Sequence, residues 1–288
     1  MGLSAGILNT IGDTALVQLV RVADGFPGQL FAKLEGFNPT GSTEDRSAVA
    51  AVDELLRRGE LVEGATLVAE TGSADFAASL TQVCRSRRVE LVCVVGPAVE
   101  AAVGGLLRAY GARVEVPDGA AADEPARAAF ARDLAGRIGG HWPGSHSALR
   151  RAESDRRAAR EILEHVDGPL DLVICDADSP AVLRGCADQI RLLGLATELV
   201  AVHLVGDADA PMPADPGVEG VRHRLRIDRT TAARACRRLV EREAILAGPR
   251  SGAALAAFEQ LADALAPDAK VVLLFPDKGH RHLDSIYS

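Results

Sequence analysis

Short apolar runs alternate with longer amphipathic stretches along most of the chain. The short runs, bounded by turn residues, predict strands at Leu30–Leu34, Thr66–Ala69, Glu90–Val95, Arg113–Val116, Leu170–Cys175, Glu198–Leu204 and Lys270–Phe275. Apolar positions three or four residues apart predict helices at Arg46–Arg58, Asp75–Arg87, Glu100–Tyr110, Glu124–Ile138, Leu149–His165, Ala181–Leu193, Thr230–Glu243 and Ser251–Ala264. This alternation predicts an α/β fold with mainly parallel sheets covered by helices.

Three segments depart from this alternation. Residues 207–220, DADAPMPADPGVEG, are rich in Pro, Asp and Gly and predict an exposed loop. The segment GGHWPGSH around His141 is expected to connect two lobes. The arginine-rich run Arg222–Arg229 is interpreted as a solvated face or a docking surface for an acidic partner.

The composition is that of a globular protein with an acidic balance. The 288 residues carry a net charge of -8, which argues against general nucleic-acid binding because neutralising phosphates needs a basic surface. No run reaches the roughly 20 apolar residues that a membrane span needs, and the N-terminus lacks the pattern of a secretory signal. The five cysteines are scattered without a C-x-x-C pair, which predicts neither a zinc site nor a disulfide framework and fits a reducing cytoplasm.

Four segments resemble the cysteine synthase group of pyridoxal-phosphate (PLP) enzymes. They are Ile7–Leu19, Leu30–Ala48, Ala247–Leu261 and Leu273–Ser288, and Leu106–Glu115 is similar as well. The closing PDKGHRHLDSIYS is most similar to the branch that makes a 2,3-diaminopropionate precursor for siderophores and antibiotics. The resemblance spans nearly the whole chain.

The resemblance implies a two-lobe α/β fold of the tryptophan-synthase-β kind, also called PLP fold type II. Residues 33–143 would form the smaller N-terminal lobe, and residues 1–32 and 144–288 the larger lobe. PLP would lie between the lobes, and the protein would be a homodimer. Members of the group carry out β-elimination and replacement at an activated serine.

The first family motif, N-P-x-G-S-x-K-D-R, places Glu44 where the family has the lysine that forms a Schiff base with PLP. That lysine also moves protons at the substrate α-carbon, and a carboxylate forms no imine. The only lysines in the chain are Lys33, Lys270 and Lys278, which lie in strands or in the terminal loop rather than at the motif. The anchoring amine is therefore absent.

The second motif, T-S-G-N-T-G, is matched by residues 72–77, and the resemblance implies that it binds the substrate carboxylate and the ring hydroxyl of the cofactor. Ser73 is kept as a hydroxyl, Asp75 places a negative charge where a carboxylate would bind, and Phe76 is expected to fill space. Anion binding at a helix start depends on free N–H groups and small residues.

The other two motifs are changed as well. Asp178, Ser179 and Pro180 stand in the matched phosphate cup G-T-G-G-T-x-x-G, where Pro180 removes an N–H donor and Asp178 repels a phosphate. In G-x-S-[ST]-G, which contacts the pyridine nitrogen, Arg250 replaces one hydroxyl and Ser251 keeps the other. Nearby Cys175 is expected to be an inert core thiol because it has no basic neighbour in sequence.

Loss at four motifs predicts a pseudoenzyme that binds no PLP and serves as a partner or regulatory subunit in specialised amino-acid biosynthesis. Besides the homodimer, it would pair with a catalytic paralogue or another enzyme of its pathway. Neither nucleic acid nor membrane is expected as a partner.

The sequence leaves other interpretations of these changes open. Glu44, Asp75 and Asp178 are expected to face one vacated cleft. They would either pair with neighbours such as Arg250 and fill it, or bind a cationic ligand or a metal in a repurposed enzyme independent of PLP. In that enzyme Glu44 or Asp75 would be the general base. An active PLP enzyme with an unusual anchor is a third possibility.

Overall fold

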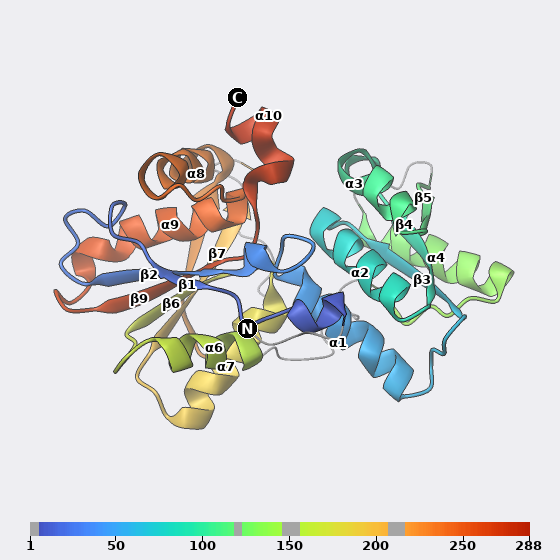
Figure 1. The fold of residues 1–288 in the computed structure, drawn as a ribbon, viewed down its shortest axis with the longest axis horizontal. Helices are drawn as coiled ribbons and strands as arrows, with labels where there is room; N and C mark the ends of the chain where they lie inside the picture. The colour runs from blue at the N-terminus through green and yellow to red at the C-terminus, as the bar shows by residue number, and fades with distance from the viewer. Residues whose placement is uncertain (1–5, 118–122, 146–155, 207–216) are drawn as a thin grey trace. The chain divides into compact units, whose positions relative to one another are not determined.

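The chain divides into two compact units. The computed structural model describes residues 6–117, 123–145, 156–206 and 217–288, so part of the predicted loop 207–220 and residues 149–155 of a predicted helix lie outside the described residues. Unit 1 comprises Met1–Ile11 and Glu44–Glu153, and unit 2 comprises Gly12–Thr43 and Ser154–Ser288. Figure 1 follows the chain through both units by colour.

Unit 2 is built on a six-stranded sheet in the order β1-β2-β9-β6-β7-β8. Its strands are β1 (Leu16–Gln18), β2 (Gln29–Leu34), β6 (Leu172–Asp176), β7 (Glu198–Val205), β8 (Val221–Asp228) and β9 (Lys270–Phe275). Only β1 pairs antiparallel, with β2, and the other pairs are parallel. The central strands are largely apolar because helices cover both faces of the sheet.

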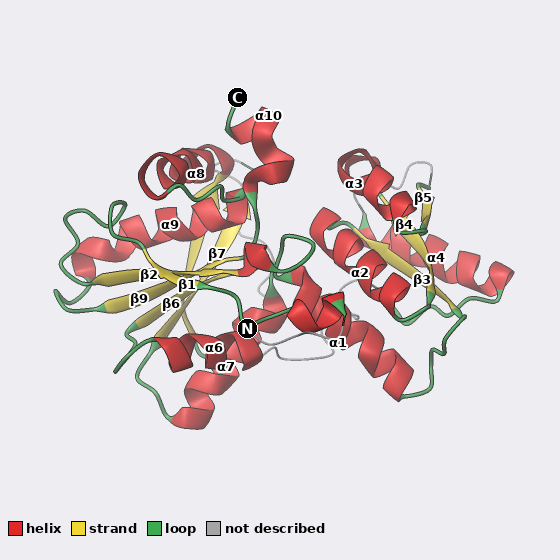
Figure 2. Cartoon of the chain, viewed as in Figure 1, coloured by secondary structure: helices red, strands yellow, loops and turns green. Residues whose placement is uncertain are grey.

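Two layers of helices enclose this sheet, as Figure 2 shows. On one face lie α6 (Arg156–His165) and α7 (Pro180–Leu193), and on the other α8 (Arg229–Glu243) and α9 (Pro249–Leu261). Helix α9 packs its small residues against the sheet and is buried over most of its length. Shorter helices are the 3-10 turns Glu35–Phe37, Ala262–Ala264 and Gly279–His282, and α10 (Leu283–Ile286).

Unit 1 has a three-stranded parallel sheet in the order β3-β4-β5. The strands are β3 (Thr66–Thr71), β4 (Glu90–Val95) and β5 (Arg113–Glu115). One face packs against α1 (Glu44–Arg57), α2 (Ala74–Ser86), α3 (Pro97–Ala109) and the 3-10 turn Ile7–Thr10, and the other against α4 (Glu124–Ile138). After α4, His141 forms a parallel bridge with Leu67 and extends the sheet by one residue.

The predicted fold class is confirmed, and the boundaries of most predicted elements agree with the structure to within a few residues. The arginine-rich run was not predicted as a strand, yet it forms most of β8, a strand at the edge of the unit 2 sheet. An edge strand pairs on one side only and its side chains are largely solvated, so it needs few apolar residues. None of the described helices combines the length and apolar character that crossing a membrane requires.

The division into units differs from the expected lobe boundaries at residues 33–43. These residues belong to unit 2 because β2 pairs along its length with β9, and the loop after it is bonded to the segment after β9. Ser42 forms a bridge with Asp277, and the Thr43 N–H donates to the Pro276 carbonyl at 2.9 Å. Residues 6–11, in turn, belong to unit 1.

Candidate functional site

A cluster of two carboxylates and one guanidinium lies at the carboxyl edge of the unit 2 sheet. Asp176 ends β6, Asp277 follows β9, and Arg250 is in the first turn of α9. Parallel strands end at a common edge, where α/β proteins bind their ligands. We call these three residues the Asp176–Arg250–Asp277 cluster.

The cluster is held by short contacts in a largely buried setting. Arg250 Nη1 lies 3.1 Å from Asp176 Oδ2, and Arg250 Nε lies 3.6 Å from Asp277 Oδ2. The side chain of Arg250 is 13% exposed, and those of the two aspartates 3% and 5%. A guanidinium so placed offsets the cost of burying both carboxylates.

Asp277 also caps the start of α9. Its carboxylate accepts hydrogen bonds from the backbone N–H groups of Arg250 and Ser251, at 3.1 and 3.0 Å. The Ser251 hydroxyl, fully buried, donates to the same carboxylate at 2.6 Å. A carboxylate at this place stabilises the helix N-terminus, and it engages the hydroxyl that the fourth motif retains.

The turn from β6 to α7 belongs to the same cluster. The Ser179 hydroxyl donates to Asp176 at 3.0 Å and accepts from Arg250 at 3.4 Å. Pro180 occupies the first turn of α7 without an N–H donor, and Asp178 is exposed in the turn. Ser179, Arg250 and Ser251, predicted from separate motifs, are thus brought together.

In unit 1, Glu44 and Asp45 begin α1 in a buried environment. Glu44 and Asp45 are each 1% exposed. Asp45 accepts a hydrogen bond of 2.5 Å from the Ser79 hydroxyl, which ties α1 to α2. Two acids in the first turn of a helix are favoured by the helix dipole.

The second motif forms the start of α2. The Ser73 hydroxyl accepts from the Phe76 N–H at 3.2 Å and caps the helix, while Asp75 is half-buried in the first turn. Phe76 is fully buried in the hydrophobic core of unit 1, so it is a packing residue.

A buried ion pair supports this start of α2, and sequence reasoning missed it. Arg127 of α4 contacts Glu70 at the end of β3, with Arg127 Nε 3.2 Å from Glu70 Oε2. A Cβ added at Gly72 would lie 3.0 Å from Arg127 Nη2, so the guanidinium lies directly against the loop. Arg127 is far from Gly72 in sequence. The only feature of the sequence that could have indicated its role was a charged residue in the first turns of a predicted helix.

Asp176 and Asp277 were also missed. The available signal was an acid at or just after the carboxyl end of two predicted strands. The predicted site residues fall into both units, with Glu44, Ser73 and Asp75 in unit 1 and Asp178, Ser179, Arg250 and Ser251 in unit 2. Their convergence on one cleft stays a prediction.

Each of the three lysines contacts other residues of unit 2. Lys33 is fully buried, with Nζ 2.6 Å from Glu161 Oε2 and 2.6 Å from the Thr14 carbonyl. Lys270 Nζ donates to the Asp167 carbonyl. Lys278 Nζ lies 4.5 Å from the ring centre of Phe37.

These residues do not fit PLP held in the way that the resemblance implies. A carboxylate at position 44 forms no imine, and the turn that would cradle the phosphate has Pro180 without an N–H donor and a carboxylate, Asp176, bound to Arg250. Ser251, which would contact the pyridine nitrogen, is bonded to Asp277.

Among the residues that the structure describes, no group of three or more His, Cys, Asp or Glu side chains is placed to hold a metal ion. Burial raises the pKa of the Cys175 thiol well above its ordinary value, so the thiol stays protonated. This agrees with the expected inert thiol.

Comparisons with known proteins match almost the whole chain. The family model described as pyridoxal-phosphate dependent enzyme matches residues 7–277. N-(2-amino-2-carboxyethyl)-L-glutamate synthase of Ralstonia nicotianae is 32% identical over 305 residues, covering 99% of this chain and 90% of that protein. The crystal structure of O-ureido-L-serine synthase has a TM-score of 0.86 at 26% identity and covers 99% of this chain and 95% of that one. An O-ureido-L-serine-bound mutant of O-ureido-L-serine synthase, with alanine in place of a lysine, has a TM-score of 0.84 at 27% identity, over 99% and 93%.

These relatives overturn the predicted pseudoenzyme. Proteins matched over nearly the whole chain are named as synthases, so the prediction of a PLP-free partner or regulatory subunit is wrong. The alternative of an enzyme repurposed around an acidic cleft is wrong for the same reason. The changes at four motifs were together given more weight than the resemblance over nearly the whole chain, and the matched synthases contradict that weighting.

Proposed function

Because the chain belongs to the family of pyridoxal-phosphate-dependent enzymes, we propose that it is a synthase of amino-acid biosynthesis. It would transfer a 2-amino-2-carboxyethyl group from an O-activated serine to an amine such as that of L-glutamate. The observation that carries this proposal is the 32% identity, over 99% of the chain, with a synthase whose product bears that group.

The start of α2 supports binding of the α-carboxylate of an amino acid. The backbone N–H groups of a helix N-terminus attract anions, and the Arg127 guanidinium behind Gly72 adds positive charge. Glu70 offsets part of that charge, and it also fixes the guanidinium in place. We assign the residues around Gly72 to substrate binding.

The proposed reaction involves no amine at position 44. The amine nitrogen forms a bond to the serine β-carbon while the bond from that carbon to the leaving oxygen breaks, and the amine loses a proton. A lysine-to-alanine mutant of O-ureido-L-serine synthase is named as O-ureido-L-serine-bound, which supports binding of an O-substituted serine by this fold after loss of a lysine.

The test is to incubate the purified chain with O-acetyl-L-serine and L-glutamate, with and without added PLP. We expect mass spectrometry to detect N-(2-amino-2-carboxyethyl)-L-glutamate above a control without protein. Arg127→Lys keeps the positive charge beside Glu70 but removes the planar guanidinium, which can donate two parallel hydrogen bonds. It should therefore raise the KM for O-acetyl-L-serine about 10-fold.

The control for this variant is Arg137→Lys, at an exposed position on the same helix, which should leave KM unchanged. Absence of product in both arms from a folded protein would contradict the proposed function. Borohydride reduction should leave no PLP attached at residue 44, and an adduct there would contradict the interpretation of Glu44.

We also propose that the chain forms a homodimer and works in the cytoplasm. The five cysteines are free and buried, which supports a reducing compartment. Pairing with a paralogue or another enzyme of the pathway stays a prediction.

A further inference from the structure

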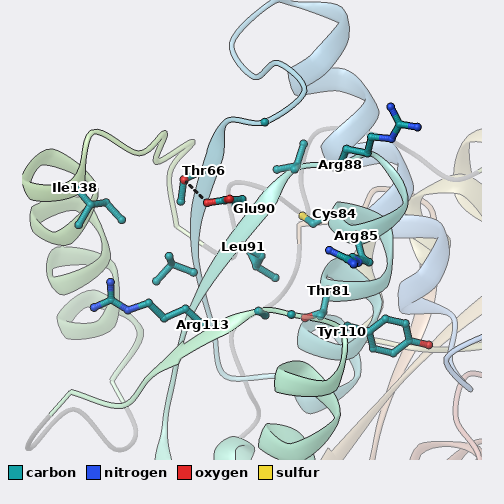
Figure 3. A pocket seen from close by; sticks show the side chains of 15 residues that line it. Thr66, Thr81, Cys84, Arg85, Arg88, Glu90, Leu91, Tyr110, Arg113 and Ile138 are labelled. Carbon is teal, nitrogen blue, oxygen red and sulfur yellow. Dashed lines mark hydrogen bonds between the residues drawn. The ribbon is translucent and has the colours of Figure 1, made fainter.

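A pocket of about 780 Å³ opens in unit 1 at the amino edge of its sheet. It is lined where the strands begin, at Thr66, Glu90 and Arg113, and where α2 and α3 end (Figure 3). The start of α2 lies at the opposite, carboxyl edge, so the pocket is separate from the residues assigned to substrate binding. Its volume is in the range of pockets that bind small molecules.

The lining carries an excess of positive charge. Three of the lining residues are arginines, Arg85, Arg88 and Arg113, and one, Glu90, is a carboxylate. In Figure 3 these side chains come from different elements around the opening. Arginine in such a set binds phosphate through two parallel hydrogen bonds.

Arg85 is the arginine that is available without breaking another contact. Its exposed guanidinium has no hydrogen-bond or ion-pair partner within the described residues, and Nη1 lies 3.9 Å from where a Cβ of Gly111 would stand. Arg88 pairs with Glu63 at 2.8 Å and Arg113 with Glu115 at 2.5 Å. Exposed pairs of this kind contribute about 0–1 kcal/mol, so both arginines can exchange them for a ligand.

A buried polar atom beside the pocket also lacks a partner. Gln82 is 5% exposed, and its amide nitrogen donates to the Tyr110 hydroxyl at 3.3 Å. Its carbonyl oxygen has no hydrogen-bond partner among the described residues. If the oxygen and nitrogen of the Gln82 amide exchange places, the nitrogen occupies the position without a partner. One atom of the amide therefore lacks a hydrogen bond in either assignment. Tyr110 lines the pocket and Gln82 does not, so the ligand is assigned no contact with this oxygen.

The remaining wall is apolar. Val89, Leu91 and Ile138 line it, and Ile138 is 39% exposed although it is a large hydrophobic residue. An inorganic ion would leave this wall in contact with water. An organic group would cover it, so the ligand combines an anion with an apolar body.

We propose that this pocket binds a small organic phosphate of about the size of a nucleoside monophosphate. Arg85 is the main phosphate ligand, Arg88 and Arg113 complete the positive field, and the organic part lies against Leu91 and Ile138. This proposal does not depend on the proposed synthase activity, because none of its residues contributes to that site.

The test is calorimetric titration of the full chain at low salt with three probes, AMP, adenosine and inorganic phosphate. AMP should bind more tightly than the other two, because only AMP combines a phosphate with an organic part that can cover the apolar wall. Arg85→Gln should weaken AMP binding about 10- to 100-fold, which is the effect of losing a charge-assisted hydrogen bond. Arg234→Gln, at an exposed arginine of α8 in unit 2, is the matched control and should leave the affinity unchanged.

Three results would overturn the proposal. These are no binding of AMP by the wild-type chain, equal AMP affinity in Arg85→Gln and wild type, and equal affinity for AMP and either simpler probe. Circular dichroism of each variant establishes that it is folded, and Arg85 is exposed, so its replacement leaves the core intact.

Discussion

The start of α1 is buried, and that makes the identity of residue 44 chemically decisive. Glu44 is 1% exposed, so protein groups rather than water surround its carboxylate. A lysine there would offer a nucleophilic nitrogen, and a carboxylate offers an acid-base group instead. One side chain therefore separates this chain from the covalent cofactor anchoring that the resemblance implies.

Lys33 shows how the same kind of amine is used for structure. Its stem crosses the core of unit 2 and its charge is matched by Glu161 at 2.6 Å. A buried pair of this kind contributes little beyond an apolar pair, but removing one partner takes away an interaction that offsets the cost of burying the other charge.

We predict that Lys33→Met lowers the free energy of unfolding by about 3–5 kcal/mol, because it leaves Glu161 charged and buried. Chemical denaturation followed by circular dichroism measures the change. The double variant Lys33→Met with Glu161→Leu removes both charges and should recover most of the loss. If the single and double variants were equally unstable, packing rather than charge would explain the effect.

At the scale of elements, α8 and α9 approach each other closely at Gly252. A Cβ added at Gly252 would lie 2.3 Å from the Ala232 carbonyl oxygen and 2.4 Å from Cys236 Sγ. The first of these atoms is backbone and cannot rotate away. The absence of a side chain at Gly252 is therefore what lets the two helices pack.

Gly252→Ala should lower the free energy of unfolding by about 1–3 kcal/mol, since the helices must separate to accept the methyl group. The matched control is Gly105→Ala in α3, where nothing lies within 4 Å of the added Cβ. That variant should be more stable by about 0.5–1 kcal/mol, because alanine favours the helix. Thermal and urea denaturation of both variants compare the signs, and a stabilised Gly252→Ala would show that the helices are not in close contact.

At the scale of the whole molecule, the proposed homodimer needs an apolar surface. Leu192, Leu193 and Leu195 at the end of α7 are 67%, 52% and 36% exposed, which is unusual for three neighbouring leucines. Clustered exposed apolar side chains mark contact surfaces. We propose that this cluster is part of the dimer interface.

Light scattering after size exclusion should give twice the chain mass of 30.1 kDa. Leu192→Asp with Leu193→Asp should shift the protein to the single-chain mass, because two carboxylates would be buried in the interface. Val62→Asp, at another exposed apolar residue, should not. A wild-type monomer would contradict the dimer, and a dimer unaffected by the leucine changes would place its interface elsewhere.

Much of the fold was predictable because it rests on local patterns. The apolar runs of β6, β7 and β9 and the periodic stretches of α7 and α9 lie within a few residues of the predicted ranges. β8 was not predicted because a strand at a sheet edge has few buried residues. The candidate site was predicted in part: Ser179, Arg250 and Ser251 were found from their motifs, while Asp176, Asp277 and Arg127 were not. Motif matching also led to a wrong function, because the changes at four motifs were given more weight than the resemblance over nearly the whole chain.

The sequence by itself determined the α/β class, the absence of an amine at position 44 and the family that the chain resembles. These depend on the order of residue types, which is complete in the sequence. Only the tertiary structure decided that Arg250 is held between Asp176 and Asp277, that Arg127 lies behind Gly72, and that Arg85 borders a pocket. Each of these joins residues from separate elements. Their distances follow from how strands and helices pack, and no local pattern carries that information.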